Sequence, residues 1–112
     1  MSLLNQNKIN ELAGEIGEEN VPVLLDIFLG ELAGYNERLS SGQLEDTSQY
    51  LAEISHALKS SAASFGADQL CELAVSFDLR VKQKVLLTDI DSSEMQNLLN
   101  QTFIEYQNLF KP

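Results

Sequence analysis

The sequence contains one cysteine and no long apolar run. Cys71 cannot form an internal disulfide bond or supply a Cys-x-x-Cys metal site, and it lies among Leu70, Leu73 and Ala74, where a small buried thiol is the commonest interpretation. No stretch approaches the roughly eighteen apolar residues needed to cross a bilayer, and the first residues lack the basic segment and apolar run of a secretory signal. We therefore expect a cytoplasmic protein with no membrane partner.

Basic residues are scarce, because 7 lysines and arginines stand against 17 aspartates and glutamates, for a formal net charge of −10. Nucleic acid is bound by clustered Lys and Arg, so this balance argues against a nucleic-acid partner and favours a protein. The first 56 residues hold ten acids and two bases, whereas four of the seven basic residues lie close together further on: Lys59, Arg80, Lys82 and Lys84. Composition leaves open whether this segment recognises negative charge or is an ordinary solvated face.

Proline occurs only at Pro22 and Pro112, and apolar residues recur every three or four positions instead of alternating, which is typical of helices. The pattern predicts helices at about residues 5–16, 21–39, 46–65, 68–81 and 91–110. A chain of 112 residues with 44% hydrophobic content has room for one modest core. We predict one all-α domain over residues 1–112, an antiparallel four-helix bundle with a short additional N-terminal helix.

Capping patterns support these boundaries. Gly17 and Gly66 are expected to end helices, and Asp46 and Asp91 are expected to begin them. The residues expected on inward faces are Ile9, Leu12, Ala13, Ile16, Val21, Leu24, Phe28, Leu32, Tyr35, Leu39, Leu51, Ile54, Leu58, Ser61, Phe65, Leu70, Leu73, Ala74, Phe77, Val81, Met95, Leu98, Leu99, Phe103, Tyr106 and Phe110.

His56, the only histidine, lies within the predicted third helix. At about 100° per residue, Leu51 and Leu58 lie within about 60° of Ile54 on the core side, whereas His56 lies at about 200°. The imidazole is therefore predicted to point to solvent. Three of its neighbours one or two turns away are small, namely Ala52, Ser60 and Ala63, and Glu53 and Lys59 flank it at i−3 and i+3.

These surroundings suit phosphoryl transfer. Small neighbours let the active site of another protein reach the ring nitrogen, as in-line transfer requires. An imidazole is largely neutral near neutral pH and keeps a lone pair for nucleophilic attack. Lys59, one turn from His56, can offset the charge of a phosphoryl group, about −1.5 to −2. Periodicity alone, however, favours an ordinary surface histidine.

Motifs for other chemistry are missing from the sequence. One His and one Cys on different helices do not make a metal-ligand set, and neither a Ser-His-Asp order nor HExxH occurs. No GxxxxGK[ST] segment is present to hold a nucleotide. We expect no metal, no cofactor and no ATP-dependent kinase activity in this chain.

The run HALKSSAASFGA, which begins at His56, resembles the signature H-x-L-K-G-S-x-x-x-x-G-A of histidine-containing phosphotransfer domains. Within that family, ISHALKSSAASFGA and the upstream NVPVLLDIFLGE are similar to single-domain phosphorelay proteins of bacterial quorum sensing. The resemblance extends to the helix pattern of the whole chain. It implies a helical bundle that carries a phosphoryl group on histidine.

Carried over residue by residue, the resemblance makes His56 the phosphorylated residue and Lys59 the cation that assists the phosphoryl group. Ser60 stands where the family usually has glycine, and serine remains small; Gly66 matches the second glycine. Many members have a glutamine twenty-two positions after the histidine, where this chain has Asp78. A carboxylate there can accept a hydrogen bond from the ring or repel the phosphate, and the sequence does not decide between the two.

The resemblance implies two receiver domains as partners: a donor in a hybrid sensor kinase and a recipient in a response regulator of the LuxO type. The magnesium ion and its acidic ligands would belong to the partner. For the docking surface, the sequence offers an apolar patch of Val23 and Ile27, for which packing under the first helix is an equal alternative, together with Ala52, Ala63 and Gly66.

The leading hypothesis is therefore a phosphocarrier that takes the phosphoryl group from one receiver aspartate onto His56 and delivers it to another. The alternative is a bundle that binds a kinase or receiver without carrying phosphate, which nothing in the helix pattern excludes. The requirement for His56 separates the two. A monomer is the default expectation.

Overall fold

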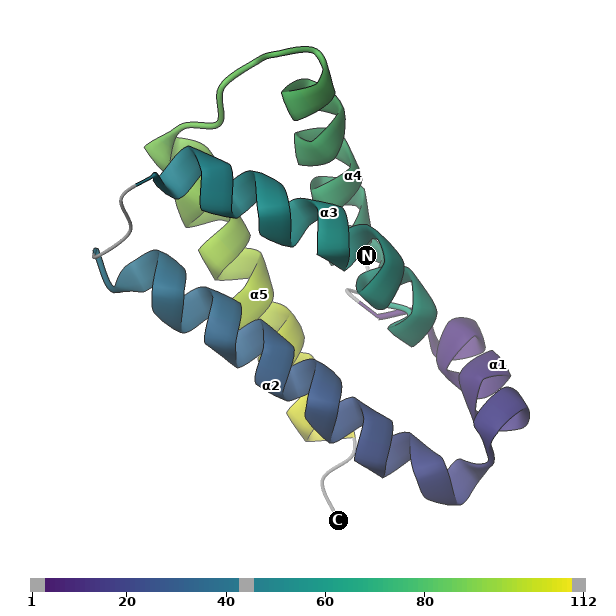
Figure 1. Cartoon of the computed structure of the whole chain (residues 1–112). Coiled ribbons are helices and arrows are strands. Elements are labelled where there is room, and N and C mark those ends of the chain that lie inside the picture. The colour runs from purple at the N-terminus through teal and green to yellow at the C-terminus, as the bar shows by residue number, and fades with distance from the viewer. Residues whose placement is uncertain (1–3, 43–45, 110–112) are drawn as a thin grey trace.

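The computed structural model describes residues 4–42 and 46–109, and within them every regular element is helical. The elements are α1 (Gln6–Ile16), a single 3₁₀ turn η1 (Glu18–Asn20), α2 (Val21–Ser40), α3 (Thr47–Phe65), α4 (Asp68–Lys82) and α5 (Asp89–Leu109). Figure 1 shows α2 beside α5 and α3 beside α4, while α1 packs near the C-terminal end of α3. The predicted all-α antiparallel bundle with a short N-terminal helix is confirmed.

Buried apolar side chains from α1 to α5 form one continuous cluster. The ring of Phe28 stacks on that of Phe65 with centroids 4.5 Å apart, and it meets the edge of Tyr106 at 5.7 Å. The Tyr106 hydroxyl donates a hydrogen bond to the carbonyl oxygen of Phe65. These aromatic contacts join the α2–α5 pair to the C-terminal end of α3. None of the described helices is long and apolar enough to cross a membrane.

Among the described residues, Val81 is the one predicted core position that is exposed, and several others are only half-buried. On α2 the buried residue is Leu25, whereas Leu24 is only half-buried. Adjacent leucines differ by about 100° around a helix, so the sequence pattern fits either one. Val81 is exposed on the last turn of α4, and Leu87 from the α4–α5 connection is buried instead. Phe110 lies outside the described residues.

The last helix begins at Asp89, two residues before the predicted start. Thr88 is the capping residue, and its hydroxyl accepts a hydrogen bond from the backbone N–H of Asp91 at 3.3 Å. In return, the Asp91 carboxylate accepts a hydrogen bond from the backbone N–H of Thr88 at 2.8 Å. Asp91 is also paired with Arg80 of α4 at 2.8 Å. This reciprocal capping box makes Asp91 the third helical residue and not the first.

The turn between α3 and α4 reverses the chain at Gly66, whose φ of 76° lies in the left-handed region. The start of the described chain covers this turn, since the Asn5 N–H donates to the Gly66 carbonyl at 2.7 Å and the Asn5 side chain donates to Asp68 at 2.9 Å. A Cβ on Gly66 would lie 2.7 Å from the Asn5 carbonyl oxygen. The α3–α4 hairpin therefore requires glycine here for both its conformation and its space.

We predict that Gly66→Ala destabilises the fold by about 2–4 kcal/mol, because left-handed strain and a steric clash add together. Gly42→Ala is the matched control: Gly42 has a φ of 72° but no atom within 4 Å of the added Cβ, so only the strain of about 1 kcal/mol applies. Urea unfolding followed by circular dichroism measures both. Equal losses for the two variants would contradict the close packing at Gly66.

Candidate functional site

His56 lies near the middle of α3 and points away from the core, as predicted. Its side chain is 71% exposed, while Leu51, Ile54 and Leu58 on the same helix are buried. The antiparallel α3–α4 hairpin places Asp78 of α4 next to the ring. The site is therefore built from two helices that a single tight turn connects.

One carboxylate connects all the charged groups of the site. Oδ1 of Asp78 lies 3.2 Å from Nδ1 of His56. Oδ2 accepts hydrogen bonds from two ammonium groups, Nζ of Lys59 at 2.7 Å and Nζ of Lys82 at 2.8 Å. The Asp78 side chain is itself nearly buried. A buried carboxylate is stable when it is paired in this way.

The hydrogen bonds from Lys59 and Lys82 hold the pKa of the Asp78 carboxyl well below its usual range, and the contact with His56 acts in the same direction, while burial opposes them. Asp78 is therefore ionised at neutral pH and can only accept hydrogen bonds. The ring nitrogen that faces it must then carry the hydrogen. For neutral His56 this assigns the proton to Nδ1 and leaves the lone pair on Nε2.

The predicted small residues surround the ring along α3. Ala52 and Ala63 are half-buried and Ser60 is exposed, so none of them adds bulk over the imidazole. Ser61, expected on the inward face, is only half-buried, and its hydroxyl donates to the Glu31 carboxylate of α2 at 3.3 Å. The ring thus remains accessible to a second protein.

The candidate docking residues divide into two groups. Val23 and Ile27 are exposed on α2, so the alternative that they pack under α1 is wrong. They share a helix face with Glu31, which contacts Ser61, so this face lies on the side of α2 next to α3. Gly66, in contrast, is buried beneath Asn5 and has a structural role in the turn.

Lys82 is the site residue that sequence reasoning missed. The sequence showed Lys82 only as one member of the basic segment. Its spacing of four residues from Asp78 on the same helix was the available signal, because this spacing favours ion pairs. The family resemblance offered Asp78 as a partner of His56, but nothing in the sequence places Lys82 there, because this depends on how α4 lies against α3. Lys59 and Lys82 of the basic segment both pair with Asp78, and the Lys82 side chain remains 61% exposed.

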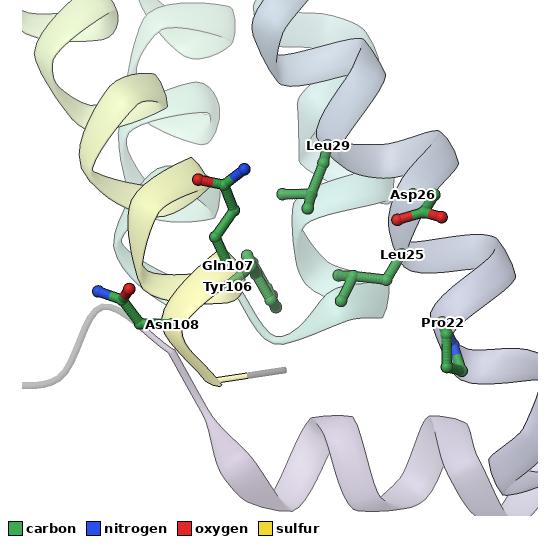
Figure 2. Close-up of a pocket in the computed structure, with 7 residues that line it drawn as sticks. All are labelled: Pro22, Leu25, Asp26, Leu29, Tyr106, Gln107 and Asn108. Atoms are coloured by element: carbon green, nitrogen blue, oxygen red, sulfur yellow. The ribbon is translucent and has the colours of Figure 1, made fainter. Parts of the chain in front are cut away.

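No cavity is needed to explain this site. A hollow of about 370 Å³ lies between α2 and α5. Figure 2 shows its lining, with Leu25 and Leu29 on one side and Tyr106 on the other. Its lining includes neither His56 nor its charged partners. In residues 4–42 and 46–109, no group of three or more His, Cys, Asp or Glu side chains is arranged to hold a metal ion.

Comparison with known proteins agrees with this geometry. The family model of the Hpt domain matches residues 23–104, which include His56, Lys59, Asp78 and Lys82. The chain is 53% identical over 107 residues to the phosphorelay protein LuxU of Vibrio cholerae serotype O1, covering 95% of both chains. It is also 53% identical to LuxU of Vibrio harveyi, over 95% of this chain and 94% of that protein. No solved structure is found to match. The chain belongs to the Hpt domain family.

Proposed function

We propose that this protein is a phosphorelay carrier that holds a phosphoryl group on Nε2 of His56. The observation that carries the proposal is the contact between Nδ1 of His56 and the ionised Asp78 carboxylate, on a ring that is otherwise exposed. A fixed Nδ1–H directs the lone pair of Nε2 outward, where a second protein can reach it. The similarity to the LuxU phosphorelay proteins supports the same function.

The proposed reaction is a direct displacement at phosphorus. Nε2 of His56 forms a bond to the phosphorus of an aspartyl phosphate as the bond from phosphorus to the aspartate oxygen breaks, and its electron pair returns to that carboxylate. The ring retains the Nδ1 hydrogen and gains positive charge. The Asp78 carboxylate, 3.2 Å from Nδ1, stabilises that charge. Delivery to the next aspartate is the reverse reaction.

The other predicted residues support access and charge. Lys59 lies one turn from His56 and supplies a cation close to the reacting ring. Ser60, Ala52 and Ala63 leave room for the partner. The chain has no nucleotide-binding glycine motif, so we infer that it carries no ATP-dependent kinase activity and no cofactor, and that the magnesium ion of the reaction belongs to the partner.

The proposed partners are two receiver domains. We infer that the donor aspartate belongs to a hybrid sensor kinase and the recipient to a response regulator of the LuxO type, in quorum sensing. This inference rests on the similarity to LuxU. The apolar cluster that extends from α1 to α5 supports the prediction of one domain over residues 1–112. We propose that it acts in the cytoplasm as a monomer.

The carrier requires His56. We predict that a phosphorylated receiver domain labels the parent protein and does not label His56→Gln. The label should be lost in acid and kept in alkali, as expected of a phosphorus–nitrogen bond. Equal labelling of both proteins would place the phosphoryl group on another residue. Failure of several phosphorylated receivers to label the parent would favour a binding module that carries no phosphate.

The partner is proposed to dock over the His-bearing side of α3 and the face of α2 with Val23 and Ile27. Exposed apolar residues on a helix next to α3 provide contact area that a receiver can bury. Both residues lie toward the N-terminal end of α2, at the end of the bundle that α1 covers.

We predict that Ile27→Glu lowers the second-order rate constant of transfer from the receiver at least about tenfold, because it places a charge in the buried contact. Leu86→Glu is the control: Ile27 is 65% exposed and Leu86 is 80% exposed, so both substitutions add one charge to an exposed position. Leu86 lies in the α4–α5 connection. Equal rates for the two variants would place the docking surface elsewhere.

A further inference from the structure

Glu31 connects α2 to α3 through hydrogen bonds with two hydroxyl groups. Oε1 of its carboxylate accepts a hydrogen bond from the Tyr35 hydroxyl at 2.9 Å and another from the Ser61 hydroxyl at 3.3 Å. Burial and the neighbouring Glu31 carboxylate raise the pKa of Tyr35, so its hydroxyl remains a donor at neutral pH. Glu31 itself is half-buried. These contacts hold the carboxylate in a defined position beside α3.

This carboxylate has no cation beside it. In residues 4–42 and 46–109, no ion pair includes Glu31, and both hydroxyl groups donate to the same oxygen. The buried carboxylates of the described chain, Asp78 and Asp91, each pair with a lysine or an arginine. Glu31 therefore presents a positioned negative charge whose second oxygen is left for a donor from another molecule.

Glu31 lies between the apolar docking residues of α2 and the reactive histidine. It contacts Ser61, which follows His56 by five residues on α3, or about 7.5 Å along the helix axis. The ring of the residue after Ile27 stacks on Phe65, which is nine residues beyond His56. A receiver that contacts Ile27 and reaches His56 with its aspartate therefore covers Glu31. Covering a charge without pairing it is unfavourable.

We propose that Glu31 is a specificity-determining residue, which pairs with a lysine or arginine of the receiver domain that docks over His56. This inference rests on the proposed carrier function and adds the chemistry that the partner presents. A receiver with a basic side chain at this position gains an ion pair with a carboxylate that is already held in place. A receiver with an apolar or acidic side chain there leaves Glu31 covered and unpaired, and is disfavoured.

The dependence of the transfer rate on the concentration of a phosphorylated receiver domain tests the proposal. We expect Glu31→Gln to raise the receiver concentration at half-maximal rate about three- to tenfold and to leave the saturating rate unchanged. The amide oxygen of glutamine can still accept from Tyr35 and Ser61, so the fold should be retained. The difference should shrink at high salt, because salt screens an ion pair.

Glu37→Gln is the matched control. It removes the same charge from the same helix, and Glu37 is exposed on the side of α2 that faces α5. Its half-maximal concentration should remain near that of the parent. Equal values for the two variants, or a loss that appears only in the saturating rate, would overturn the proposal. A parent protein that takes no label would instead refute the carrier function itself.

Charge reversal identifies the basic partner. Glu31→Lys should weaken docking more than Glu31→Gln, because it brings like charges together. The lysines and arginines around the phosphorylated aspartate of the receiver are then replaced by glutamate, one at a time. One replacement should restore transfer to the Glu31→Lys protein and weaken transfer to the parent. If no replacement restores transfer, the ion pair does not form and the proposal is wrong.

Discussion

The site depends on the reversal of the chain at Gly66. A left-handed φ of 76° and the covering contact from Asn5 fix how α4 returns along α3. That return places Asp78 opposite His56, although the two are 22 residues apart. A shift of α4 by one turn would move its side chains by about 5.4 Å along α3 and separate these groups. A packing constraint far from the ring therefore determines the chemistry of the ring.

The Asp78 carboxylate links this packing to the reactivity proposed for His56. A nearly buried carboxylate is unfavourable alone, but the ammonium groups of Lys59 and Lys82 keep it ionised. Once ionised, it selects which nitrogen of His56 carries the hydrogen. In the proposed reaction it also stabilises the charge that the ring gains on phosphorylation. In many members of the family this position is a neutral glutamine. Here the Asp78 carboxylate also accepts a hydrogen bond from the ammonium group of Lys82.

Local features of the sequence were sufficient for the helices and for the exposure of His56. Periodicity placed the ring outside the core, and α3 begins after Asp46 and ends at Gly66 as predicted, with the Asp46 carboxylate accepting a hydrogen bond from the Gln49 N–H. The partnership of Asp78 with both lysines could not be predicted, because helical periodicity contains no information on how one helix is aligned against another. The same limit explains Leu24 and Val81, whose burial depends on neighbouring helices.

The central claim is that Asp78 fixes the hydrogen on Nδ1 of His56 and leaves Nε2 as the nucleophile. Nuclear magnetic resonance of the phosphorylated, ¹⁵N-labelled protein tests this most directly, through the phosphorus–nitrogen coupling and the ¹⁵N shifts of the ring. We predict that phosphorus is coupled to Nε2 and that Nδ1 still carries its hydrogen. Phosphorus bonded to Nδ1, or a ring whose Nδ1 has no hydrogen, would contradict this account.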